Sequence, residues 1–177
     1  MKHLPMYLTV AAIVVLGGCG SSKTDTTAST ATTDTTAATV SLCATAQLAV
    51  SLGQPKGTAG TIDYPLILHN TGSAKCTVQG YAGVSFVSGA DDHQVGQTAG
   101  KDPGSAPTVT LSPGQAASAT LEVADAKSFP PDCNMIPVSR LRVTPPGQAA
   151  SLIIGHADTA CTNPMYTTMH VGPFAGP

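Results

Sequence analysis

The stretch TIDYPLILHN, residues 61–70, carries the clearest sign of the fold. Apolar side chains stand at every second position of it, at Ile62, Tyr64, Leu66 and Leu68. Because successive side chains of a β-strand point to opposite faces, this spacing places the four on one face, against a core. Pro65 has no N–H to give to a ladder, so we expect the strand to lie at a sheet edge or to bulge there.

Further short runs of this kind follow from Leu42 onward, separated by Gly, Pro, Asn and Asp. In SRLRV, residues 139–143, we expect Arg140 and Arg142 to face water while the residue after each faces inward. The other predicted strands cover residues 48–52, 83–87, 108–111, 121–123, 151–154 and 167–171. Together with residues 61–70 and 139–143, the sequence predicts about eight short strands.

The pattern of the folded part is not helical. No segment keeps apolar residues at i, i+3, i+4 and i+7 over ten or more positions. The chain also has 18 Gly and 14 Pro among 177 residues, and these would interrupt most helices. The predicted fold class is therefore all-β, an immunoglobulin-like antiparallel β-sandwich, with a small barrel as the rival.

The charge of the chain argues against one class of partner. Eight Lys and Arg stand against ten Asp and Glu, a formal net charge of -2. No basic block could neutralise a row of phosphates, which is the feature that dominates nucleic-acid binding. We therefore expect no nucleic-acid partner.

The first residues have the plan of an export signal. A positively charged start precedes an apolar run, Leu8 to Leu16, and small residues lead to Cys19. The run is shorter than the roughly 20 residues that a spanning helix needs. LGGC resembles the bacterial lipobox, in which the cysteine sulfur receives a diacylglyceryl group and the chain is cut just before it. We therefore expect a lipoprotein signal peptide over residues 1–18 and an acylated Cys19. Two acyl chains on this cysteine would anchor the protein stably to the membrane.

A Thr-rich stretch follows the predicted lipidation site. Residues 20–39 hold nine Thr among twenty residues, with no aromatic and no long aliphatic side chain. Such a composition cannot offset the entropy of ordering, so residues 19–40 are expected to form a disordered tether. A flexible chain of this length spans about 25 Å. It is either a bare spacer or a carrier of O-linked sugars. Residues 41–177 are expected to form a single β-sandwich domain.

Four cysteines remain after Cys19 is assigned to lipid: Cys43, Cys76, Cys133 and Cys161. An even set in an exported chain indicates two disulfides, for which three connectivities are possible. We favour bonds between sequence neighbours, Cys43 with Cys76 and Cys133 with Cys161, because each would then hold one local group of strands. A zinc site is the competing use, but no C-x-x-C pair is present to form it.

Four stretches carry a family resemblance: NTGSAKCTVQGYAGVSF (70–86), LSPGQAASATL (111–121), CNMIPVSRLRVTPPG (133–147) and CTNPMYTTMHVGP (161–173). Together they resemble the actinobacterial secreted and lipoprotein family catalogued as domain of unknown function 4232, over about residues 42 to 173. The resemblance implies a fold and an extracytoplasmic location and no activity. We expect scaffold roles for these residues, and Pro113 with Gly114 fits the centre of a type II turn.

Catalytic motifs are missing from the sequence: there is no G-x-S-x-G, H-E-x-x-H, S-x-x-K or P-loop. The adjacent Asp91 and Asp92 precede His93 where a hairpin turn is expected, which indicates a solvated turn, with a weak divalent-cation site as the alternative. Met165, Met169 and His170 offer thioether and imidazole ligands that suit reduced copper. On a strand, however, position 170 would point away from the other two. We expect no cofactor and no metal ligand.

Three functions remain open from the sequence. We favour a lipid-anchored, extracytoplasmic cell-membrane protein that is not an enzyme and that binds, or structurally supports, an envelope protein, glycan or lipid. Its contact surface would be the Gly-rich, Asp-rich and Ser-rich segment 88–107. The first alternative is an exported copper carrier that uses Met165, Met169, His170 and His93. The second is an exported hydrolase with an unrecognised arrangement of Ser, His and Asp.

Overall fold

The structure, a computed structural model, describes residues 39–58 and 60–176. The predicted signal peptide over residues 1–18, the lipidation site Cys19 and nearly all of the predicted tether lie outside the described residues. Within the described part, no helix is long and apolar enough to cross a membrane.

The described residues form twelve strands and three short 3-10 helices, and this confirms the all-β class. The strands are β1 (Leu48–Leu52), β2 (Lys56–Thr58), β3 (Thr61–Asn70), β4 (Cys76–Val78), β5 (Gly83–Ser88), β6 (His93–Val95), β7 (Gly100–Lys101), β8 (Val109–Leu111), β9 (Ala116–Ala124), β10 (Met135–Thr144), β11 (Leu152–Cys161) and β12 (Met169–Val171). The 3-10 helices are η1 (Thr45–Gln47), η2 (Ala126–Ser128) and η3 (Pro131–Cys133).

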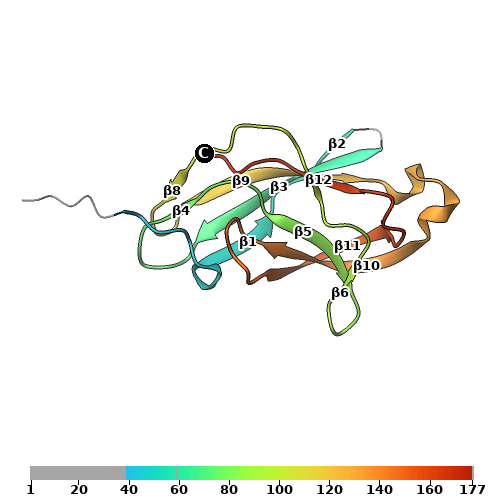
Figure 1. Ribbon diagram of the computed structural model, residues 1–177, viewed down its shortest axis with the longest axis horizontal. Helices are drawn as coiled ribbons and strands as arrows, with labels where there is room; N and C mark the ends of the chain where they lie inside the picture. Colours follow the sequence, from blue (N-terminus) through green and yellow to red (C-terminus); the bar gives the residue numbers. More distant parts are fainter. Residues whose placement is uncertain (1–38, 59, 177) are drawn as a thin grey trace, which may run out of the picture. The chain divides into compact units, whose positions relative to one another are not determined.

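The strands form three separate sheets rather than one closed barrel. The largest has the order β1-β3-β9-β12-β7, with β2 paired to β3; the second has the order β11-β10-β5-β6; and β4 pairs with β8. The named strand pairs are antiparallel except for β12 with β7, which is parallel. Figure 1 shows β3, β9 and β12 in one layer and β5, β10 and β11 in the other. The immunoglobulin-like assignment stays a prediction.

The hydrophobic core lies between the two larger sheets. One continuous cluster of buried side chains draws on both of them, with Leu66 and Leu121 from the first sheet and Phe86 and Leu141 from the second. The alternation in residues 61–70 explains the contribution of β3, because Leu66 and Leu68 are completely buried on its inner face. Burial of such side chains from water is the dominant favourable term in folding.

Pro65 does not lie on an edge strand, so the first of the two expectations for it was wrong. Strand β3 pairs with β9 on one side and with β1 and then β2 on the other. The partner on the second side is interrupted between Leu52 and Lys56, where Pro65 accepts a hydrogen bond from Gly53 N at 2.7 Å. The missing N–H of Pro65 therefore falls opposite Gly53, beside the break between β1 and β2, and only the return bond of that one pair is absent.

Two local expectations are confirmed in detail. In β10 the side chains of Leu141 and Val143 are fully buried while both arginines stay partly exposed. The turn before β9 has Gly114 at φ +80°, and Gln115 N donates to Ser112 O at 3.0 Å. This is the geometry of a type II turn, in which glycine takes the positive φ.

Candidate functional site

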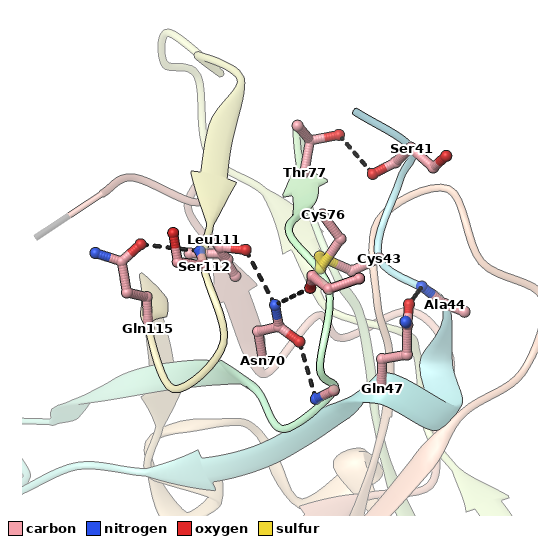
Figure 2. Close-up of a disulfide and its surroundings, with 12 residues drawn as sticks. Ser41, Cys43, Ala44, Gln47, Asn70, Cys76, Thr77, Leu111, Ser112 and Gln115 are labelled. Atoms are coloured by element: carbon pink, nitrogen blue, oxygen red, sulfur yellow. Dashed lines mark hydrogen bonds between the residues drawn. A yellow bond between two sulfur atoms is a disulfide. The ribbon is translucent and has the colours of Figure 1, made fainter. Parts of the chain in front are cut away.

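The buried side chain of Asn70 joins three segments at one end of the domain. Its Nδ2 donates to the carbonyl oxygens of Ala74 at 2.9 Å and Leu111 at 3.0 Å, and its Oδ1 accepts from Gly72 N at 3.0 Å. Figure 2 shows these bonds beside the disulfide that contains Cys43. Since every side-chain polar atom of Asn70 is used within the fold, this residue acts as scaffold. We refer to this part of the molecule as the Cys43 end.

Both disulfides have the favoured pairing. Cys43 is joined to Cys76 with a Cα–Cα distance of 4.8 Å, and Cys133 to Cys161 with 4.9 Å. All four side chains are buried. The first bond ties the chain just before η1 to β4, and the second ties η3 to the end of β11. Within residues 39–58 and 60–176, no group of three or more His, Cys, Asp and Glu could hold a metal ion.

The turn with the adjacent aspartates is held by arginines. Asp91 and His93 are strongly exposed and contact each other at 3.5 Å, as expected of a solvated turn. Asp92 has φ +52°, and its carboxylate contacts the Arg140 guanidinium at 2.7 Å. Arg140 also donates to Gly89 O, and Arg142 donates to Asp92 O. The Asp92 carboxylate is thus engaged in fixing the turn, and the segment 88–107 carries β6 and β7 rather than being one long loop.

Three of the four residues that the copper alternative would use, Met165, Met169 and His170, occupy different environments. Met165 is 84% exposed in the loop before β12, whereas Met169 is buried in the core. The side chain of His170, the next residue of β12, is 44% exposed, and its Nδ1 lies 3.2 Å from Asp102 Oδ1. The two thioethers are therefore divided between the core and a loop, and the imidazole faces Asp102.

A histidine that the sequence did not single out takes a central position. The His156 ring lies between Tyr64 of β3, at 5.0 Å edge to face, and Phe86 of β5, at 6.2 Å and nearly parallel. Its side chain is only 9% exposed, and its Nε2 lies 3.2 Å from Asp158 Oδ2. His156 thus connects the core between the sheets to a carboxylate nearer the surface.

Asp158 is held as a carboxylate by its neighbours. Its Oδ1 accepts a hydrogen bond from Thr159 N at 2.7 Å, and its Oδ2 faces His156. Burial alone would raise the pKa of this carboxyl, but the hydrogen bonds from His156 and Thr159 and the charge of His156 outweigh it and lower the pKa. Burial, together with the charge of Asp158, raises the pKa of the Tyr64 hydroxyl. Asp158 is therefore ionised and Tyr64 neutral at pH 7.

Asp158 forms one wall of a pocket of about 250 Å³. The other lining residues come from the start of β3 and the end of β9: Gly60, Thr61, Ile62, Val123, Ala124 and Asp125. Two hydrogen bonds hold the rim, from Asp125 N to Gly60 O at 2.9 Å and from Lys127 N to Asp125 Oδ1 at 3.0 Å. The pocket combines an apolar floor, formed by Ile62, Val123 and Ala124, with the carboxylates of Asp125 and Asp158. We refer to this part of the molecule as the pocket end.

The Cys43 end and the pocket end lie at opposite ends of β3. Asn70 closes this ten-residue strand and pairs with the first residue of β1, while Thr61 and Ile62 open it at the pocket. At about 3.3 Å per residue, the two ends are roughly 30 Å apart. Figure 1 shows β4 and β8 on one side and β2 on the other. The described chain thus begins at the end opposite the pocket.

Sequence reasoning missed this site because its parts are distant along the chain. Gly60 and Asp158 are 98 positions apart, and a single sequence contains no sign that β11 faces the junction of β3 and β9. The one available signal was Asp158 two residues after His156, which places both side chains on one face of a strand. The hydrolase hypothesis required a serine beside a His–Asp pair, and within the described residues the hydrogen-bond partner of His156 is Asp158.

A comparison with known protein families finds one match: the family model described as Domain of unknown function (DUF4232) matches residues 43–175. No curated protein matches the chain, and no solved structure does. The matched region contains both disulfides and the whole pocket.

Proposed function

The chain belongs to the DUF4232 family, and from that premise we propose that it is a lipid-anchored protein of the cell envelope that acts by binding. In this proposal Cys19 carries the anchor on the extracytoplasmic face of the membrane, and the Thr-rich residues 20–39 hold the β-domain away from the lipid headgroups. The bound component is an envelope protein, glycan or lipid.

The two disulfides support an extracytoplasmic location. Their four sulfurs are buried and paired in a domain without a metal cluster among its described residues. Disulfides of this structural kind form and persist in oxidising compartments and are rare in the cytosol. The cysteines therefore agree with the export signal and the LGGC motif of the sequence.

The observation that carries the binding role is the position of the pocket. The described chain begins at the Cys43 end, and the pocket opens roughly 30 Å away at the opposite end of β3. A domain attached through its N-terminal side would leave such a pocket free to meet a partner. A carboxylate held by two donors inside a pocket is also the kind of convergent polar group found in binding sites.

The anchor is tested in the native host with a clickable palmitate analogue. We expect the label on the parent protein and its loss in the Cys19→Ser variant, which should also leave the detergent phase on phase separation. Mass spectrometry should find the mature chain beginning at an acylated residue 19. An unlabelled protein, or one with an uncut N-terminus, would refute the anchor.

The binding role is tested with a photo-crosslinking amino acid placed in intact cells at position 62, on the pocket floor. Position 42 is the matched control, because Leu42 is similarly exposed, at 49% against 41%, but lies at the Cys43 end. We expect one reproducible adduct from position 62 and a weaker one or none from position 42. Equal crosslinking from both positions, or none from either, would contradict a binding role for the pocket end.

A further inference from the structure

The charge of the pocket points to the class of its ligand. Among its seven lining residues are two carboxylates, Asp125 and Asp158, and no lysine, arginine or histidine. Asp158 is oriented by Thr159 N and by the His156 ring, which is itself held between two aromatic side chains. An oriented carboxylate with its donors already in place requires little reorganisation when a cation arrives.

The floor and the size of the pocket narrow that class further. Ile62 is 41% exposed although it belongs to the inner, apolar face of β3, and Val123 and Ala124 lie beside it in the lining. An apolar surface of this kind favours contact with an aliphatic group over water. The volume of about 250 Å³ is below the 300–1,000 Å³ that drug-sized ligands commonly occupy. A group of a few heavy atoms fits this volume.

We propose that the pocket receives an ammonium group on a short aliphatic stem, with Asp158 as its counter-ion and Ile62 and Val123 beneath the stem. This inference rests on the proposed binding function and specifies its ligand. Two sources have this chemistry, a free aliphatic amine and the lysine side chain of a protein. The competing explanation for Asp158 is structural, since a charge on the inner face of the edge strand β11 also discourages pairing with another sheet.

The test uses the acylated full-length protein in detergent micelles, with isoleucine and valine methyl groups labelled for NMR. The probe is butylammonium chloride, and 1-butanol is its neutral counterpart with the same stem. We expect the Ile62 and Val123 methyl signals to shift with millimolar affinity, as a five-atom ligand allows, and butanol to bind at least tenfold more weakly. The methyl group of Ile67, on the other face of β3, serves as the internal control.

Variants separate the charge from the shape of the pocket. Asp158→Asn should remove the preference for butylammonium over butanol, whereas Asp91→Asn, at an exposed carboxylate outside the lining, should retain it. If Asp158→Asn does not fold, Ile62→Lys provides the test. Its own ammonium should occupy the pocket and abolish the Val123 shift, whereas the uncharged Ile62→Gln should weaken butylammonium binding without abolishing that shift. Persistence of the preference in Asp158→Asn would overturn the proposal and leave Asp158 with its structural role. So would the absence of any shift of the two methyl signals at about 50 mM probe, roughly fiftyfold above a Kd of about 1 mM.

Comparison with Nα-acetyl-lysine methylamide distinguishes the two sources. Binding at least tenfold tighter than that of butylammonium assigns the site to a lysine side chain, and equal binding assigns it to a free amine.

The two experiments also distinguish a wrong ligand class from a wrong binding function. If position 62 crosslinks in cells but butylammonium does not bind, only the ligand class is wrong. If butylammonium binds and position 62 captures nothing, the pocket chemistry stands and the envelope-binding role falls.

Discussion

Replacing Asn70 by alanine should be among the most damaging single changes in this domain. The side chain is completely buried and makes three hydrogen bonds, to Ala74 O, Leu111 O and Gly72 N. A buried hydrogen bond contributes about 1 kcal/mol net, and a polar group left unpaired in the interior costs about 1–3 kcal/mol. We therefore expect Asn70→Ala to lower the free energy of unfolding by about 3–5 kcal/mol. Asn70→Asp should be worse, because a carboxylate cannot donate to either carbonyl.

Urea unfolding of the disulfide-intact protein, followed by far-ultraviolet circular dichroism, measures this loss. The corresponding fall in Tm for a domain of this size is roughly 10–15 °C. The matched control is Asn163→Ala, since this side chain also donates one hydrogen bond and accepts another, but at the surface, and it should cost less than about 1 kcal/mol. If Asn70→Ala costs no more than Asn163→Ala, the argument that burial makes these bonds decisive is wrong.

Three further outcomes follow from the geometry. Removing the second disulfide with Cys133→Ser and Cys161→Ser should lower the free energy of unfolding by about 3.5 kcal/mol, because the bond closes a loop with a sequence separation of 28 residues. A loss below about 1 kcal/mol in urea unfolding would contradict this. The lowered pKa of Asp158 means that its contribution to stability is present above its ordinary pKa of 3.8 and is lost as the pH falls through the folded-state value. Asp158→Asn should therefore flatten the acid side of a stability-versus-pH curve, and an unchanged slope would refute the shift. Gly96→Ala should lower the free energy of unfolding by more than about 2 kcal/mol, because the new Cβ would lie 2.3 Å from Cys161 O and residue 96 has φ +67°. Gly57→Ala is the control in the same assay. Its Cβ would meet no atom within 4 Å, so the loss should be about 1 kcal/mol or less.

The parts of the fold that could be predicted are those that carry their own pattern. Residues 48–52 coincide with β1, and the run over residues 61–70 coincides with β3, because alternating burial is visible in a single strand. The short strands β2, β4 and β7 were missed, and β6 was expected only as the second arm of the hairpin around Asp91 and Asp92. In β7, for example, Gly100 and Lys101 have no β-type pattern and are extended because they pair with His170 and Val171. Such strands are defined by a partner far along the chain.

The same reason explains the interpretation of Pro65. The residue type alone shows that Pro65 cannot donate a backbone hydrogen bond to a neighbouring strand. Whether the position lies on an outer edge or beside a break depends on the neighbouring strand. Here the break between β1 and β2 lies opposite Pro65, so a central strand accommodates the proline.

The four stretches in which the sequence resembles the family contain none of the residues that line the pocket. The four stretches that carry the resemblance, 70–86, 111–121, 133–147 and 161–173, contain Asn70, three of the four disulfide cysteines and the type II turn. None of the seven pocket residues falls within them, since the lining comes from residues 60–62, 123–125 and 158. The four stretches that resemble the family therefore belong to the frame, and the pocket residues lie outside them. Ligand choice in this chain should follow from those few residues, so exchanging Ile62 or Asp158 should alter binding while the frame and its disulfides remain intact.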